Sequence, residues 1–267
     1  MIGIVCPVGP VDRWGYQRNL AECVGSFCEF ADLVVLVQSH EEAAGLGELA
    51  GRYGNLSVLA NEQTWFHDGR YRAERVAFNR NLGADALRQV GCSSILHLDC
   101  NWYIPESSRA ELRKACGEAQ GVRWLFRGCQ VGKWLFSPGM RLPNLHGPGA
   151  RMALDDDSAI SPDGATVRRE SGFWPERGGQ MVVDTELEVT WGELEERMNF
   201  VRCYADLAVD RSPVFDRRFW QAFYRRKYAS RKRSGFELGK VGQAIAARHE
   251  AKFVSETIAG ELKWNIT

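Results

Sequence analysis

The first hundred residues alternate between short apolar runs and segments with a helical pattern. Four apolar runs have the length of strands: residues 2–6, 33–37, 56–59 and 95–98. Three segments between them have the spacing of amphipathic helices: residues 16–30, 41–53 and 75–90. The second run is apolar at every position, which is typical of a parallel strand covered on both faces. This alternation predicts an α/β fold whose sheet is mostly parallel and flanked by helices.

The pattern changes after residue 120. Further strands are predicted at residues 124–126, 133–136 and 181–190, and the span 137–180, rich in Gly, Pro, Asp and Arg, predicts irregular structure. The remainder is mostly helical in pattern, with helices predicted at 193–208, 214–232 and 240–260. We therefore expect one domain over residues 1–192 and a helical C-terminal extension over 193–267 packed on it.

Composition excludes several classes of protein. The 267 residues are 45% hydrophobic, and 34 basic residues balance 34 acidic ones, so neither disorder nor an overall charged character is indicated. Eight cysteines are scattered without a C-x-x-C pair, which favours a reduced, cytoplasmic protein. The longest apolar run, residues 33–37, is too short to span a bilayer, and the N-terminus has no signal-peptide pattern.

A carboxylate directly follows the fourth apolar run. Asp99 comes after Ile95–Leu98, and Asn101 lies two residues further on. In open α/β sheets ligands bind at the carboxyl ends of the strands. Asp99 is therefore a candidate ligand-binding residue, and the alternative is that it only caps a turn.

This segment, the opening strand Ile2–Pro7 and the stretch Arg80–Gly83 together resemble the nucleotide-sugar half of a family-2-type GT-A glycosyltransferase. The resemblance covers roughly residues 1–110, and Arg80 lies nineteen residues before Asp99, in the expected strand order. It implies a GT-A-like (Rossmann-like) fold, a nucleotide-sugar donor, most simply a UDP-sugar, and Mn²⁺ or Mg²⁺ on the diphosphate. It implies donor-binding roles for Pro7, Arg80, Asn81 and Asp99, and metal-binding roles for Asp99 and Asn101.

Two positions depart from the family's pattern. Asn101 stands where a second carboxylate is common, although an amide oxygen also suits a hard cation. Gln38-Ser39 stands where an acidic pair holds the base or ribose, and Glu41 or Glu42 could replace that pair. These departures motivate an alternative, a catalytically degenerate module that binds nucleotide or nucleic acid. A nucleotidyltransferase is a third possibility, for which Pro7–Arg13 is a poor phosphate loop.

An inverting transfer needs a general base after the metal motif. Asp184, 85 residues after Asp99, is the first candidate, and Glu186 on the same segment is the second. Asp155–Asp157 and Glu176 are further candidates, and each of these carboxylates could instead be solvated. His146 is a candidate metal ligand or acceptor contact, although a lone histidine in a loop is more often neither.

Residues 217–233 carry eight basic side chains and no acidic one, with aromatic residues at helical spacing. One reading is a helix whose aromatic face packs on the sheet while its charges are solvated. The others are an anionic acceptor, such as a modified base in DNA or a phosphorylated glycan, or peripheral contact with an anionic membrane surface.

Overall fold

The structure is a computed structural model that describes residues 1–8, 19–38, 45–61, 72–131, 134–155, 158–171, 181–185 and 239–248. Its strands are β1 (Ile2–Val8), β2 (Leu33–Gln38), β3 (Leu56–Ala60), β4 (Ser94–His97), β5 (Trp102–Tyr103), β6 (Val122–Val131), β7 (Trp134–His146), β8 (Arg151–Met152), β9 (Ser158–Ile160), β10 (Thr166–Arg168), β11 (Glu170–Ser171) and β12 (Met181–Asp184). Its helices are α1 (Leu20–Phe30), α2 (Leu46–Arg52), α3 (Arg72–Gln89), α4 (Arg109–Gly117) and α7 (Gly239–Arg248), with a short 3₁₀ turn at Glu106–Ser108.

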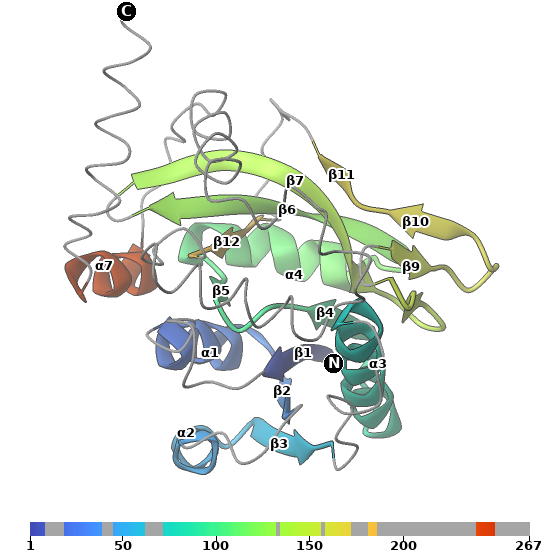
Figure 1. Cartoon of the computed structure of the whole chain (residues 1–267), viewed down its shortest axis with the longest axis horizontal. Coiled ribbons are helices and arrows are strands. Elements are labelled where there is room, and N and C mark those ends of the chain that lie inside the picture. The colour runs from blue at the N-terminus through green and yellow to red at the C-terminus, as the bar shows by residue number, and fades with distance from the viewer. Residues whose placement is uncertain are drawn as a thin grey trace, which may run out of the picture.

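One large sheet organises the molecule (Figure 1). Its strand order is β3-β2-β1-β4-β7-β6-β12-β5, and β11 adds to the side of β7. The first four strands are parallel, as are β6 and β12, whereas β7 and β5 run antiparallel to their neighbours. This confirms the predicted α/β fold with a mostly parallel sheet flanked by helices, in which strand–helix alternation produces the parallel half.

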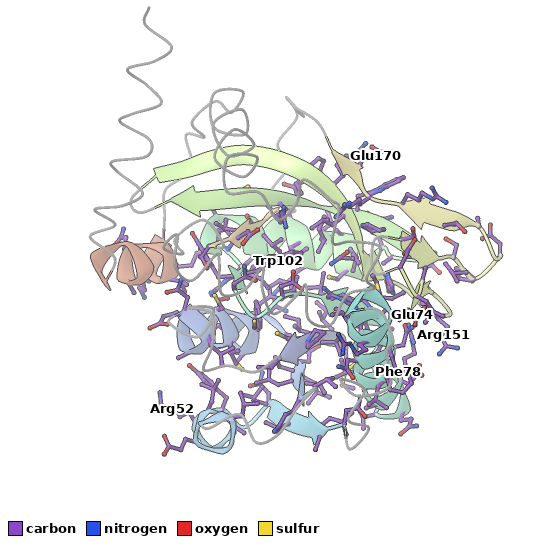
Figure 2. The ribbon with its side chains drawn as sticks, in the orientation of Figure 1. Arg52, Glu74, Phe78, Trp102, Arg151 and Glu170 are labelled. Atoms are coloured by element: carbon purple, nitrogen blue, oxygen red, sulfur yellow. The ribbon has the colours of Figure 1, made fainter. Side chains whose placement is uncertain are left out.

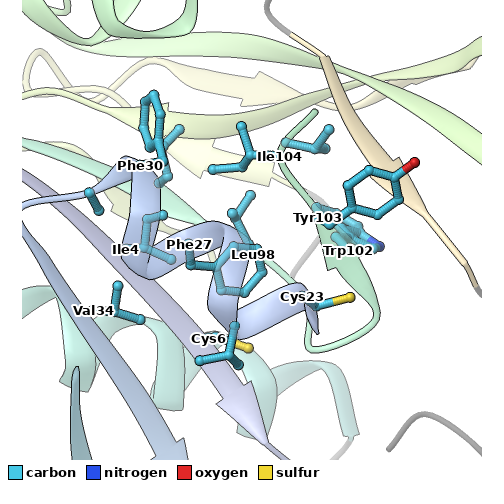
Figure 3. Packing of buried hydrophobic residues seen from close by; sticks show 14 of the residues in the cluster. Ile4, Cys6, Cys23, Phe27, Phe30, Val34, Leu98, Trp102, Tyr103 and Ile104 are labelled. Carbon is cyan, nitrogen blue, oxygen red and sulfur yellow. The ribbon is translucent and has the colours of Figure 1, made fainter. Parts of the chain in front are cut away.

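The side chains of β1 alternate between two apolar layers, one on each face of the sheet. Ile4 and Cys6 are completely buried against Phe27 of α1, as Figure 3 shows. Val5 points to the other face, where it packs with Leu87 of α3. A strand covered on both faces has no solvent side, which explains why the first strands are apolar at nearly every position.

Helix α3 packs so closely on the sheet that position 83 has no room for a side chain. A Cβ added to Gly83 would lie 2.3 Å from Val5 Cγ2 and 2.7 Å from Val37 Cγ2. The glycine of the Arg80–Gly83 stretch therefore permits close helix–sheet packing.

We expect Gly83→Ala to lower the free energy of unfolding by about 1–3 kcal/mol, because the overpacking outweighs the better helix propensity of alanine. Urea denaturation measures the change. Gly47→Ala in α2 is the matched control, since nothing lies within 4 Å of its added Cβ, and it should be neutral or stabilising. A Gly83→Ala protein as stable as the control would contradict the prediction.

The prediction of irregular structure over residues 137–180 is wrong for its first part. Strand β7 continues to His146, and β8, β9 and β10 form a separate three-stranded antiparallel sheet. Pro138 and Pro143, which argued against a strand, both lie in β7 at the two places where its register with β6 shifts. An irregular register tolerates a residue without an N–H, so pairing with β4 and β6 on its two sides overrides the local signal.

Part of the predicted C-terminal extension packs on the first domain. Helix α7 contacts α1 (Figure 1), and Val241 packs against the apolar layer on that face. The helices predicted at 193–208 and 214–232, with the basic stretch 217–233, lie outside the described residues. Within the described part of the chain, no helix is long and apolar enough to cross a membrane.

Candidate functional site

The segment after β4 crosses the carboxyl end of the sheet. The Leu98 N–H still donates to the Val5 carbonyl at 3.0 Å, and the chain then turns into β5 with the Trp102 N–H donating to the Asp99 carbonyl at 3.0 Å. The turn is thus closed by the backbone of Asp99. Its carboxylate is left to other partners, so the side chain does more than cap a turn.

Arg80 and Asp99 form an ion pair at this edge. Arg80 Nη2 lies 2.6 Å from Asp99 Oδ1. The arginine side chain is only 4% exposed, whereas that of Asp99 is 39% exposed. A ligand can therefore reach the Asp99 carboxylate, while the buried guanidinium of Arg80 holds that carboxylate in place. The packing of α3 beside β4 thus brings together two of the four residues that the resemblance assigned to the donor.

The neighbours of Arg80 tie α3 to other elements. The Asn81 side chain donates to the Met152 carbonyl and accepts from the Met152 N–H, both at 3.0 Å, and so anchors β8 to the helix. Asn79 accepts a 2.7 Å hydrogen bond from Asn61, which follows β3. Asn81 is thus occupied with the protein backbone, and its expected role in donor binding stays a prediction.

A second cluster of polar side chains includes Asn101, which lies two residues after Asp99 in the sequence. Asp184 is 1% exposed and accepts a 2.9 Å hydrogen bond from Asn101 Nδ2 through its Oδ1 atom. Its Oδ2 atom lies 3.2 Å from Arg127 Nη1, in an ion pair whose arginine side chain is 12% exposed. One oxygen of the carboxylate is therefore hydrogen-bonded and the other is ion-paired, by side chains from two different segments.

The sheet explains why these segments meet. Strand β12 pairs on one side with β5, where Asp184 lies opposite Trp102, and on the other with β6, where it lies opposite Cys129. Figure 2 labels Trp102, whose ring lies beneath the guanidinium of Arg127 at 5.6 Å. The N–H and hydroxyl of Thr185 both donate to the Asn101 carbonyl, at 3.0 and 2.9 Å. Two chain segments 83 residues apart are thus clamped together.

Two completely buried histidines, His97 and His146, lie at the ends of β4 and β7. His97 Nε2 and His146 Nδ1 are 3.1 Å apart, and His146 Nε2 donates to the Pro143 carbonyl at 2.9 Å. Both ring nitrogens of His146 are therefore occupied inside the protein, which leaves it no open position for a metal or an acceptor. Burial lowers the pKa of His97 well below its ordinary value, and it lowers the pKa of His146 from 6.5 to about 4.

The lowered pKa of His146 makes stability depend on pH. His146 is protonated near pH 6.5 in the unfolded chain but only near pH 4 in the folded protein. The free energy of unfolding therefore decreases as the pH falls through this window. We expect the free energy of unfolding to fall by up to about 1.4 kcal/mol per pH unit for this group. Urea denaturation between pH 7.5 and 5 measures the slope. It should be smaller in His146→Gln, and an unchanged slope in that variant would contradict the assignment.

The oxygen atoms at this edge suit a hard cation delivered by a nucleotide. Within the described residues, no group of three or more His, Cys, Asp and Glu side chains could hold a metal ion. A Mg²⁺ ion that arrives on substrate phosphates needs only one or two protein oxygens, and Asp99 with Asn101 offers a carboxylate and an amide. The nitrogen of Asn101 faces Asp184, which turns its carbonyl oxygen away from that carboxylate. The residues present therefore fit such an ion.

The other predicted residues are placed as follows. Pro7 lies near the end of β1, half-buried and paired with Val37. Asp155 accepts from the N–H and hydroxyl of Ser158 at 3.0 and 2.8 Å and so closes a turn. Five further candidates lie outside the described residues: Glu41, Glu42, Asp156, Asp157 and Glu176. Glu186 lies outside them too, immediately after the described Thr185.

Sequence reasoning missed Arg127 and His97. The strand Val122–Val131 carries two arginines, Arg123 and Arg127, and nothing in its sequence distinguishes the one that pairs inside the sheet. The partner itself could not be found without the order of the strands. Cys6 is also close to the site, and burial, with Cys100 and Asp99 adding to it, raises the pKa of its thiol well above the usual value. That thiol therefore stays neutral.

Comparison with known proteins gives only distant similarities. No family model matches the chain, and no curated protein is similar to it. The structure of S. aureus TarS 1–349 is 14% identical with a TM-score of 0.41, and the match covers 86% of this chain and 72% of that one. The complex of TarS 1–349 with UDP-GlcNAc is 18% identical with a TM-score of 0.33 and covers 48% of this chain and 34% of that one.

A third similar structure is the 4-diphosphocytidyl-2C-methyl-D-erythritol synthase of Anaerococcus prevotii. It is 11% identical with a TM-score of 0.32, and the match covers 84% of this chain and 82% of that one. In the UDP-GlcNAc complex the match thus spans about a third of TarS 1–349. Similarities this distant assign neither a family nor a ligand, so the functional argument rests on the residues of the chain itself.

Proposed function

We propose that this protein is an inverting, metal-dependent glycosyltransferase that moves a hexosyl group from a nucleotide sugar to an acceptor hydroxyl. The observation that carries the proposal is the hydrogen bond of 2.9 Å between Asn101 and Asp184. It joins the segment proposed to bind the donor to the residue proposed as base, although the two are far apart in the sequence. In a transferase of this kind the donor-binding segment and the base must both lie close to one anomeric carbon.

On the donor side, Arg80 and Asp99 would hold the diphosphate. The guanidinium is nearly buried and already oriented by its 2.6 Å contact with Asp99, so it costs little reorganisation when a phosphate binds. Asp99 and Asn101 would be the protein ligands of a Mn²⁺ or Mg²⁺ ion. When bound, that ion neutralises the negative charge that develops on the leaving diphosphate. Pro7 lies near the end of the strand over which the nucleotide would lie, in line with ligand sites in open α/β sheets.

On the acceptor side, Asp184 would take the proton of the attacking hydroxyl. Its carboxylate is buried and held by Asn101 and Arg127, so the acceptor can reach it only after a rearrangement of the surrounding chain. Glu186 follows it closely in sequence and is the second candidate for the same role. Burial of the base excludes water from the proton transfer, which disfavours hydrolysis of the donor.

The donor is tested by thermal unfolding in the presence of UDP-, GDP-, dTDP- and CMP-sugars, each with MnCl₂ or with EDTA. UDP-GlcNAc is the first probe, since one of the similar structures contains it. A ligand at a hundred times its Kd stabilises the native state by about 2.7 kcal/mol, which a melting curve detects. A metal-dependent shift with one nucleotide sugar supports the proposal, and no shift with any of them overturns it.

The acceptor is proposed to be anionic because residues 217–233 carry eight basic side chains. A modified base in DNA, a phosphorylated glycan and a lipid-linked acceptor on an anionic membrane all share this property. DNA binding that weakens steeply between about 50 and 200 mM salt would favour the first of them. Absence of binding to DNA at low salt would remove it.

A nucleotide-binding module without transferase activity is the second candidate. The burial of Asp184, with 1% exposed, favours it, because a base so enclosed cannot meet an acceptor without rearrangement. The two candidates differ in one measurement. A module binds the nucleotide sugar but releases no free nucleotide diphosphate in the presence of any acceptor, whereas the transferase does.

A further inference from the structure

Asn101 departs from the acidic pattern that its segment resembles, and the structure supplies a reason for the departure. We propose that Asn101 and Arg127 are positioning residues for Asp184, and that position 101 carries an amide because a carboxylate there would face another carboxylate. The inference rests on the proposed function, since it assigns the base role to Asp184. It goes further by naming the two residues that hold the base and by linking the base to the donor segment.

The orientation of the Asn101 side chain follows from its partner. An ionised carboxylate only accepts hydrogen bonds, so the Asn101 atom 2.9 Å from Asp184 Oδ1 must be the amide nitrogen. Asn101 and Asp184 are 6% and 1% exposed, and little water screens what lies between them. An aspartate at position 101 would bring two carboxylates together there, and neither could donate a hydrogen bond to the other while both carry their charge.

Arg127 holds the other oxygen of the same carboxylate. Its Nη1 atom lies 3.2 Å from Asp184 Oδ2, and its guanidinium lies over the ring of Trp102 at 5.6 Å. Arginine presents a planar group that can pair with a carboxylate and stack on an aromatic ring at once. A hydrogen bond from the segment before β5 on one oxygen and an ion pair from β6 on the other restrict the rotation of the Asp184 carboxylate.

The same network connects the base to the donor segment. Thr185 donates two hydrogen bonds to the Asn101 carbonyl, and the Trp102 N–H donates to the Asp99 carbonyl. Any shift of the Asp99–Asn101 turn on donor binding is therefore passed directly to Asp184. Asn101 thus contacts Asp184 through its side chain and Thr185 through its backbone carbonyl, so one residue joins the proposed base to the donor segment.

The first experiment exchanges the two side chains. Asn101→Asp, Asp184→Asn and the double variant are purified, and their melting midpoints are compared. We expect Asn101→Asp to lower the midpoint by about 5 °C or more, because it creates a buried pair of carboxylates. The double variant re-forms an amide–carboxylate contact with exchanged polarity and should melt above Asn101→Asp. Strictly additive losses would overturn the proposed contact.

The second experiment separates binding from chemistry. Two quantities are measured for Asn101→Asp, Arg127→Lys and Arg127→Met. The first is the shift of the melting midpoint with UDP-GlcNAc, or with whichever donor shifts the wild type. The second is the kcat for release of the nucleoside diphosphate. We expect all three variants to retain the donor-induced shift. We expect kcat to fall about 100-fold in Asn101→Asp and Arg127→Met, and less in Arg127→Lys. Arg109→Lys, which alters the Glu29–Arg109 ion pair away from the site, should match the wild type.

Two outcomes would overturn the inference. If Asn101→Asp binds donor and metal more tightly and transfers faster, position 101 is only a metal ligand and the amide has no positioning role. If the donor shift is lost in Asn101→Asp while kcat at saturating donor is unchanged, the residue acts in binding alone. A wild type that binds no donor defeats the proposed function itself, and the exchange experiment then still reports whether the contact exists.

Discussion

Replacing Asp99 with alanine is expected to abolish sugar transfer and the metal-dependent part of donor binding. Asp99 is the exposed member of the Arg80 pair and the carboxylate nearest to the proposed diphosphate site. Removing one group that stabilises developing charge usually reduces kcat by about 10²–10³-fold, and loss of the metal adds to this. The rate is measured as release of nucleotide diphosphate, and binding as the donor-induced shift of the melting midpoint with and without MnCl₂.

Alanine also removes the partner of a buried guanidinium, so a second variant is needed. Asp99→Asn keeps an oxygen that can accept from Arg80 while it loses the charge that attracts a cation. It should fold like the wild type and still lose the metal-dependent shift. Asp85→Asn is the matched control, because Asp85 is half-exposed and pairs with Arg88 and Arg151 away from the site. Full activity in Asp99→Asn would contradict the assignment of the site.

Replacing Asp184 with asparagine is expected to reduce transfer by about 10²–10⁴-fold, the usual contribution of a positioned general base. Donor binding should persist, because the residues proposed to hold the diphosphate are unchanged. The variant should also be less stable by about 1–3 kcal/mol, since one amide oxygen cannot satisfy both Asn101 and Arg127. Melting curves with the donor, and kcat at saturating donor, separate these effects.

The same Asp85→Asn protein serves as the control for this variant. Two results would count against Asp184 as the base. One is a rate close to that of the wild type, which would move the role to Glu186. The other is loss of the donor shift together with the rate, which would mean that Asp184 supports the donor site rather than the acceptor.

The parallel half of the fold and the donor side of the candidate site could be predicted from the sequence. Strands such as Leu33–Gln38 and the helix carrying Arg80 are set by short-range periodicity, which the chain displays residue by residue. The interval from Arg80 to Asp99 spans one helix and one strand, so the two meet wherever that helix packs beside that strand. Local pattern and near neighbours sufficed there.

Helix α4 and most of β7 were not found by the same reasoning. Pro138 and Pro143 interrupt the strand signal of β7, and only pairing with strands on both sides compensates for them. The contacts of Arg127 and His97 were likewise invisible, because each depends on a residue that lies on another strand.

The strand–helix alternation and the carboxylate at the end of the fourth strand therefore follow from local sequence alone. The contacts of Asp184 with Asn101 and Arg127 depend on the tertiary structure. These residues lie on three segments that become neighbours because β12 inserts between β5 and β6. Strand order is a property of the whole sheet, since it depends on which edges remain open after the other strands have paired, and no local pattern of side chains encodes it.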